Sequence, residues 1–175
     1  MNALTARQWL LLLWAAAWGL VMASSLLQDW ARLNACSLCI LQRLLFILFG
    51  VFALLFALPS ARVMQRLYRG AGVFLALLGS CGLGVAIYQT LMQSVPGLVP
   101  ECSYSNPGPI ERFIDWLGGV WLDLDLPVLS ELFLATGECS SKEWVFLGLS
   151  LANWAAVAFL SFGLAALWAT RRRKA

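Results

Sequence analysis

The chain has 175 residues, of which 61% are hydrophobic and only 12% are charged, with a net charge of +3 at pH 7 and no histidine. Soluble domains are about half apolar and about a quarter charged, so this composition excludes a soluble protein and predicts an integral membrane protein.

Four apolar stretches are each long enough to cross the hydrocarbon core of a bilayer, which takes about 20 helical residues. They must be helices, because lipid offers the backbone no hydrogen-bond partners. The predicted fold class is an all-α membrane protein, a four-transmembrane-helix bundle built from a single domain of residues 1–175. The expected helices are 9–27, 40–58, 70–92 and 144–168, and the expected outer loops are 28–39 and 93–143.

The first apolar segment, 9–27, has two interpretations. Arg7, the apolar run and a small-residue site near Ala23 resemble a cleavable secretory signal, but a run of 19 residues is longer than a typical signal core and favours a membrane helix.

Three of the segments also carry small residues once per helical turn, which lets membrane helices approach closely and indicates a compact bundle. These residues are Ala15, Gly19 and Ala23, then Gly72, Ala76, Ser80 and Gly84, then Gly148, Ala152 and Ala156.

The sequence C-S-L-C at 36–39 precedes the second segment, and Arg43 follows Cys39 by one helical turn. If the helix starts near Cys39, the thiol and the guanidinium share one face. The helix dipole and the cation then both favour the thiolate, which is the reactive form of cysteine. A lone C-x-x-C also occurs as a structural disulfide, as half of a metal site or as two inert thiols. Arg43 also suits a snorkelling interface cation or an ion pair with Asp29 or Glu143.

One further cysteine, Cys81, lies alone in the middle of the third segment among Gly, Leu and Ser residues. We expect it to be a small buried thiol that fills a packing gap between helices. It is therefore expected to be dispensable for activity.

The long segment 93–143 is predicted to be a functional loop, because loops of this length are uncommon in compact domains. Turn-forming Pro and Gly residues surround Cys102, and Cys139 lies near the end of the loop. The aromatic and charged residues of 110–121 indicate a short amphipathic helix, which either lies on the bilayer or packs on top of the bundle. Both loop cysteines would face an oxidising compartment, where disulfides are permitted.

The distribution of charge predicts the orientation. Eight Lys and Arg residues flank the segments on one side of the membrane and three lie on the other, which places both termini and the 59–69 loop in the cytoplasm. All nine acidic residues lie on the opposite side, and the eight within 93–143 give that loop a net charge of −6. The basic run 171–174 suits a stop-transfer flank better than a nucleic-acid or lipid site.

Taken together, these motifs resemble those of a known family. The string C-S-L-C-I-L-Q-R at 36–43, the second cysteine pair in the long loop and W-V-F-L-G at 144–148 ahead of the last helix closely resemble DsbB, the disulfide bond formation family of the bacterial inner membrane. The resemblance covers nearly the whole chain. Its specific parts are the 36–43 string and the layout of two cysteine pairs.

The resemblance implies a thiol:quinone oxidoreductase with four catalytic cysteines and no metal or nucleic acid. Cys36 and Cys39 match the pair that exchanges electrons with a bound quinone, ubiquinone or menaquinone. In that match Cys39 attacks the quinone, Cys36 forms an inter-loop disulfide during turnover, and Arg43 is the arginine beside the quinone. Cys102 and Cys139 match the loop disulfide that oxidises a periplasmic, thioredoxin-fold DsbA-type partner. The partner attacks Cys102, and Cys139 passes the electrons to Cys36.

The chemistry of the residues agrees with an external electron acceptor. Closing a disulfide releases two electrons and two protons, and the sequence has neither a GxGxxG after a strand nor a C-x-x-C-H that would bind a flavin or haem. A lipid-soluble quinone can reach a dithiol at the head of a membrane helix, where Arg43 would stabilise negative charge on the quinone oxygen and on Cys39. Some relatives have a histidine near the end of the third helix. This chain has Tyr-Gln-Thr at 88–90 instead, so a step that depends on histidine is not carried over.

Three other functions fit parts of the sequence: a specialised DsbB paralogue with one dedicated partner, a cysteine-based metal transporter or sensor, and a structural protein with two permanent disulfides. Zinc sites usually use paired short spacings, whereas Cys102 and Cys139 are 37 residues apart with no histidine to help. Trapping of mixed disulfides with a thioredoxin-like protein would distinguish an enzyme from the last two.

Overall fold

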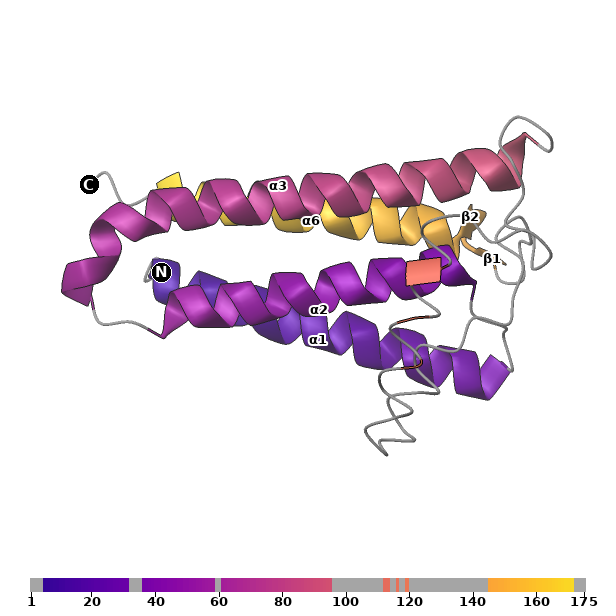
Figure 1. Cartoon of the computed structure of the whole chain (residues 1–175), viewed down its shortest axis with the longest axis horizontal. Helices are drawn as coiled ribbons and strands as arrows, with labels where there is room; N and C mark the ends of the chain where they lie inside the picture. Colours follow the sequence, from indigo (N-terminus) through magenta and orange to yellow (C-terminus); the bar gives the residue numbers. More distant parts are fainter. Residues whose placement is uncertain are drawn as a thin grey trace.

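The computed structural model describes residues 5–31, 36–58, 61–95, 112, 113, 116, 119 and 145–171, and in 61–69 it describes the backbone only. Four long helices run side by side (Figure 1). They are α1 (Ala6–Ala31), α2 (Ser37–Ala57), α3 (Ala61–Ser94) and α6 (Leu151–Arg171). A short antiparallel hairpin, β1 (Val145–Phe146) and β2 (Leu149–Ser150), comes directly before α6.

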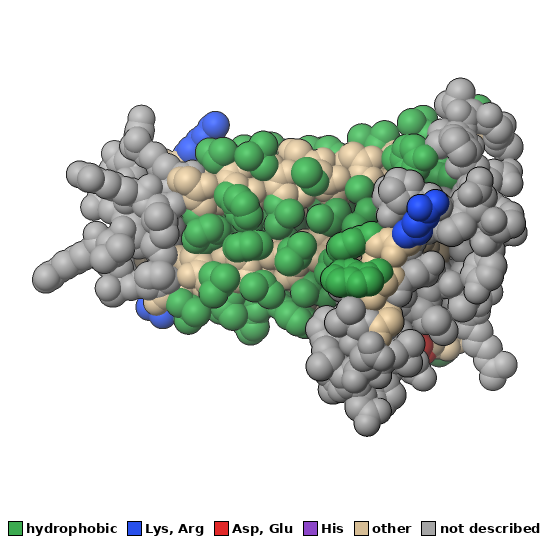
Figure 2. Space-filling model, viewed as in Figure 1, with side chains coloured by type: hydrophobic (Ala, Val, Ile, Leu, Met, Phe, Trp, Pro, Cys, Tyr) green, Lys and Arg blue, Asp and Glu red, His purple; other side chains and the backbone are tan. Residues whose placement is uncertain are grey.

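All four helices are long and apolar enough to cross a membrane, with Gly70–Ser94 as the apolar part of α3. Figure 2 shows hydrophobic side chains over the middle of the visible face, with Lys and Arg side chains towards its ends. An outer surface this apolar is stable in lipid and not in water. The predicted four-helix membrane bundle is therefore confirmed.

The helices are paired along the bundle. Helix α1 packs along α2 and α3 packs along α6, while α2 also contacts α3 and α1 also contacts α6. Both chain termini lie at the same end of the bundle, and the start of α2 and the hairpin lie at the opposite end (Figure 1). We call the latter the dithiol end, because Cys36 and Cys39 are located there.

The starts of α1 and α2 are capped by side chains. The Thr5 backbone N–H donates to the Gln8 side-chain oxygen at 2.8 Å, and the Gln8 N–H donates to the Thr5 hydroxyl at 3.4 Å. This reciprocal pair is a capping box, which satisfies amides that have no partner inside the helix. In α2 the cap is Cys36, whose sulfur accepts the backbone N–H of Cys39.

Aromatic rings fill the centre of the bundle. Phe46 of α2 stacks on Phe159 of α6 with ring centroids 3.9 Å apart, and Phe49 meets Phe162 edge to face at 5.3 Å. Smaller residues complete the core around these rings: Leu10, Leu13 and Ala17 from α1, Ala53 and Ala57 from α2, Leu75 from α3 and Ala166 from α6.

Glycines bring α3 and α6 together. A β-carbon on Gly82 would collide with the ring of Phe159, and one on Gly79 would lie 3.2 Å from the Phe159 carbonyl oxygen. On the opposite helix, Gly163 faces Ala76. Small residues at these positions allow the two backbones to approach, as in other membrane helix pairs.

The predicted small-residue stripe on α1 is wrong as a packing face. Ala15, Gly19 and Ala23 are all exposed, and a β-carbon on Gly19 would meet nothing within 4 Å. In α3 the stripe is half right, because Gly72 is buried whereas Gly84 is exposed. Close approach in these helices uses neighbouring faces, which hydropathy does not distinguish.

The last helix starts later than predicted. Residues 145–150 form the hairpin, and α6 begins at Leu151. The turn has Leu147 at φ 53° and Gly148 at φ 79°, a left-handed pair that ends helical continuity before α6. The Trp154 indole N–H donates to the Phe146 carbonyl at 3.1 Å and attaches the hairpin to the helix. Gly148 is therefore a turn residue and not a helix-packing residue.

The expectation that Cys81 is buried is also wrong. Its side chain is exposed on the outer surface of α3, where a thiol meets lipid in a membrane. Of the predicted amphipathic segment 110–121, the structure describes Arg112, Phe113, Trp116 and Gly119, all helical. The rings of Phe113 and Trp116 lie 6.1 Å apart and are exposed, and the rest of that segment lies outside the described residues.

Candidate functional site

The first turn of α2 brings the two cysteines of the C-x-x-C together. The sulfur atoms of Cys36 and Cys39 lie 2.8 Å apart. Cys36 is the N-cap residue, so its sulfur also accepts the Cys39 backbone N–H at 3.3 Å. The helix dipole favours negative charge at this position, so the local structure favours a thiolate here.

A buried pair of glutamines contacts both sulfurs. The side-chain nitrogen of Gln89 on α3 donates to Cys36 Sγ at 3.3 Å and to Cys39 Sγ at 3.1 Å. The Gln89 side-chain oxygen accepts from Gln42 of α2 at 2.8 Å. Sequence reasoning missed both residues, although buried polar residues in membrane helices are a known signal of function.

Arg43 lies on the same side of α2 as Cys39 and is only 8% exposed. Its Nη2 donates to the Ser24 carbonyl of α1 at 3.5 Å, while its Nη1 is buried with no hydrogen-bond partner among the described residues. Asp29 is exposed and forms no ion pair with Arg43 within 4 Å, and Glu143 lies outside the described residues. A buried cation does not match a snorkelling side chain, because snorkelling moves the charge into water.

An apolar pocket opens beside these residues. It has a volume of about 250 Å³ and lies between α1, α2 and α6. Its polar wall comes from Cys39, Gln42 and Arg43, and its other walls are mostly aliphatic and aromatic. The apolar lining consists of Leu20, Val21, Phe46, Leu151, Ala152, Trp154, Ala155, Val157 and Ala158. The pocket therefore brings Cys39 and the buried guanidinium of Arg43 next to a mostly apolar surface.

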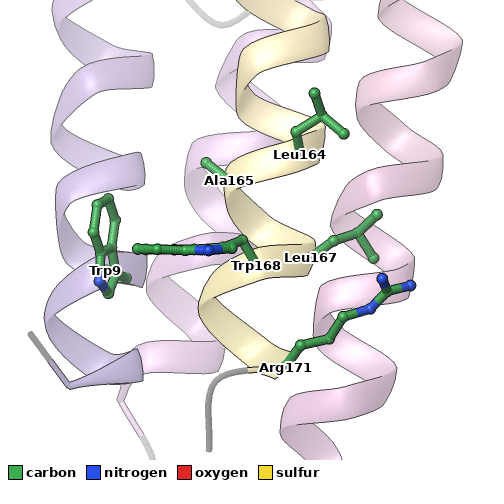
Figure 3. Close-up of a pocket in the computed structure, with 6 residues that line it drawn as sticks. All are labelled: Trp9, Leu164, Ala165, Leu167, Trp168 and Arg171. Atoms are coloured by element: carbon green, nitrogen blue, oxygen red, sulfur yellow. The ribbon is translucent and has the colours of Figure 1, made fainter.

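A second, larger groove lies at the end of the bundle near both termini. It has a volume of about 640 Å³ and runs along α1 and α6. Trp168 points toward Trp9, and the rings meet edge to face at 5.1 Å, while Arg171 points to the other side of α6 (Figure 3). No cysteine is among the described residues that line this groove.

The structure describes some of the predicted site residues and not others. Cys36, Cys39 and Arg43 are brought together as the sequence predicted, while Cys102 and Cys139 lie outside the described residues. No group of three or more His, Cys, Asp or Glu side chains that could hold a metal occurs in the described part of the chain.

Comparison with known proteins gives consistent matches over most of the chain. A family model described as "Disulfide bond formation protein DsbB" matches residues 6–169. A disulfide bond formation protein B of Dechloromonas aromatica is 44% identical over 155 residues, which cover 87% of this chain and 85% of the relative. The protein of the same name from Azoarcus sp. is 38% identical over 81% of this chain and 78% of the relative. The one from Aromatoleum aromaticum is 35% identical over 98% of this chain and 96% of the relative.

Proposed function

The chain belongs to the DsbB family of disulfide bond formation proteins, and from this premise we propose that it reoxidises a periplasmic DsbA-type dithiol oxidase and passes the electrons to a membrane quinone. Membership makes the chain a multi-pass membrane oxidoreductase of disulfide bond formation. The partner and the electron acceptor are the proposed part.

The proposed electron path uses two cysteine pairs. The partner's dithiol reduces the Cys102–Cys139 disulfide, and the partner leaves oxidised. Cys139 then attacks Cys36 of the Cys36–Cys39 disulfide, which forms a mixed disulfide and releases Cys39 as a thiolate. Attack of Cys102 on Cys139 restores the loop disulfide and releases Cys36, so Cys36 and Cys39 are both left reduced. Each exchange is thiolate attack on a sulfur, so a stabilised thiolate at 36–39 favours the step in which Cys39 leaves as the thiolate.

One observation carries the proposal of a quinone: Cys39 and Arg43 line the same apolar pocket, and Arg43 Nη1 has no hydrogen-bond partner among the described residues. The residues fit a quinone, because its ring matches the apolar walls and its carbonyl oxygens are acceptors for an unpaired buried donor. Bound there, a quinone would supply a two-electron, two-proton acceptor for the dithiol.

The chain's own residues would carry out the rest of the chemistry. Arg43 would hold an anionic oxygen and also favour the Cys39 thiolate, since a preorganised cation costs no reorganisation when charge develops. Phe46 and the α6 wall would exclude water and so strengthen both interactions. Cys36 would close the disulfide from its position 2.8 Å away.

We further propose that the protein lies in the bacterial inner membrane with both termini in the cytoplasm. Eight of the twelve Lys and Arg residues lie on the side of the termini, which supports this orientation by the positive-inside rule. The dithiol end of the bundle then faces the periplasm, where the partner would be found.

The test is reconstituted turnover. The purified full-length protein is mixed with a reduced DsbA-type protein and ubiquinone or menaquinone, and oxidation of the partner is followed together with reduction of the quinone. We expect two thiols oxidised per quinone consumed, loss of turnover in Cys39→Ala, and turnover retained in the matched control Cys81→Ala. Partner oxidation without quinone consumption, or equal turnover in Cys39→Ala, would refute the proposed path.

A further inference from the structure

We infer that the Gln89 side-chain amide is a catalytic hydrogen-bond donor to the Cys36–Cys39 dithiol, and that Gln42 is the positioning residue that orients it. This inference rests on the proposed function, because it concerns the same dithiol. It assigns a task to two buried glutamines that the sequence pattern does not reveal.

The geometry gives one donor to each sulfur. A primary amide nitrogen carries two hydrogens, and Gln89 Nε2 lies 3.3 Å from Cys36 Sγ and 3.1 Å from Cys39 Sγ. A thiolate on either sulfur therefore keeps a donor. Charge can pass from one sulfur to the other without leaving a buried anion unsolvated, which matters because each sulfur reacts in turn.

Gln42 determines which end of the amide faces the sulfurs. Its Nε2 donates to Gln89 Oε1 at 2.8 Å, so rotation of the Gln89 amide by half a turn would bring two donors together and an oxygen against the sulfurs. The two glutamines are only 2% and 6% exposed, so water does not compete for these hydrogen bonds. The hydrogen bond from Gln42 therefore fixes the Gln89 amide with its N–H groups directed at the sulfurs.

The amide remains a neutral donor over the whole physiological pH range. Arg43 of α2 interacts electrostatically with Cys39 and Cys36 and also with Asp29 of α1, while α3 contributes the Gln89 amide. The chain has no histidine that would add a titration near neutral pH. Gln89 is therefore expected to favour formation of the first thiolate of the pair.

Stabilisation of the thiolate also changes how readily the Cys36–Cys39 disulfide is reduced. Reduction of the Cys36–Cys39 disulfide takes up two electrons and one proton to give one thiolate and one thiol. A donor that stabilises the thiolate stabilises the reduced pair, so the disulfide becomes a better oxidant of the loop cysteines. If the thiolate loses a tenfold stabilisation, the reduction potential of the Cys36–Cys39 disulfide falls by about 30 mV.

The first test measures the thiolate directly. The full-length protein is reduced, freed of quinone and alkylated with iodoacetamide between pH 5 and 9, and labelling of Cys36 and Cys39 is resolved by peptide mass spectrometry. Gln89→Met keeps the volume and removes the donor, and Gln89→Glu keeps the shape and, where the carboxyl is ionised, presents only acceptors. We expect alkylation at neutral pH to be about tenfold slower in both, since a hydrogen bond to a charged group is lost. Gln89→His should recover part of the rate, because it restores an N–H donor.

Thr90→Val is the matched control. Thr90 follows Gln89 on α3, is half-buried and bonds to Asn153 and the Ala86 carbonyl instead of the sulfurs. Its substitution should leave the pH profile of alkylation unchanged. An equal shift in Thr90→Val and Gln89→Met would mean that helix packing controls the thiols, which would overturn the inference.

The second test separates Gln42 from Gln89. Gln42→Leu should slow alkylation by less than Gln89→Met, and it should add nothing in a Gln89→Met background, because Gln42 acts through the amide. Additive effects would show that Gln42 acts on the thiols by another route and would overturn its assignment.

Alkylation and the thiol–disulfide potential, measured against a glutathione buffer, require neither quinone nor partner. A wild-type pH profile in Gln89→Met and Gln89→Glu would refute the catalytic donor even if the enzyme turns over. A shifted profile in a protein that oxidises no DsbA-type partner would instead refute the proposed function alone.

Discussion

Substitution of Arg43 by Leu should separate activity from stability in this protein. Arg43 is buried at 8% exposure, makes one long hydrogen bond of 3.5 Å to the Ser24 carbonyl and leaves Nη1 without a partner among the described residues. A buried cation with so few partners costs stability, whereas the same cation facing an anionic ligand oxygen stabilises it.

The expected magnitudes follow from this geometry. Loss of one charged donor at a developing anion is worth about 2–3 kcal/mol, or about 30- to 150-fold in kcat/KM for the quinone. Leu fits an environment of Val21, Phe46 and Leu20 and leaves no buried charge. The free energy of unfolding should therefore stay the same or rise by about 1–2 kcal/mol. Lys should restore only part of the activity, because it lacks the planar fork of donors.

The assay compares quinone-dependent oxidation of a DsbA-type partner with thermal unfolding in the same detergent. Arg7→Gln is the control, since it removes an exposed cation at the opposite end of the bundle and should change neither quantity. Near wild-type kcat/KM in Arg43→Leu, with lowered stability, would refute the reasoning and assign Arg43 a structural role in the bundle.

Three further outcomes are expected. Cys39→Ser should abolish quinone reduction in a correctly inserted protein. Cys81→Ala should keep full turnover with almost no change in melting temperature, because the Cys81 thiol is exposed. Loss of turnover in Cys81→Ala would mean that the electron path is misassigned. Gly82→Ala should lower the free energy of unfolding by about 1–3 kcal/mol, because the added methyl group collides with the packed ring of Phe159. The methyl group of Gly84→Ala meets nothing within 4 Å, so this variant should be neutral or stabilised in thermal unfolding. A DsbA-type partner without its resolving cysteine should become covalently trapped on Cys102, as mapped by non-reducing electrophoresis and mass spectrometry, and a complex mapped to the other loop cysteine would contradict the relay.

Much of the fold follows from local features of the sequence. Each helix is specified by an apolar run of sufficient length, and the juxtaposition of Cys39 and Arg43 follows from a spacing of four residues on one helix. The sequence pattern predicts too early a start for α6, because residues 145–148 are as apolar as a helix start. The left-handed turn at Leu147 and Gly148 instead folds them into a hairpin.

The partners of the dithiol are not local. Gln89 is 53 residues from Cys36 in the chain, and only the packing of α3 against α2 brings its amide to the sulfurs. The same holds for the pocket, whose walls come from three helices, and for the unpaired Nη1 of Arg43, which depends on what α1 and α6 leave open around it.

The sequence by itself determined that the chain is a membrane bundle of four helices with a dithiol and a cation at the head of one of them. Only the tertiary structure decided which face of each helix turns inward. It buried Gln42 and Gln89 and left the small-residue stripe of α1 and Cys81 on the outside. The physical reason is that lipid is as apolar as the interior of the bundle, so hydropathy drives each helix into the membrane without distinguishing its inner face from its outer one. That choice depends on shape and on the few polar contacts, and both arise only when the helices meet.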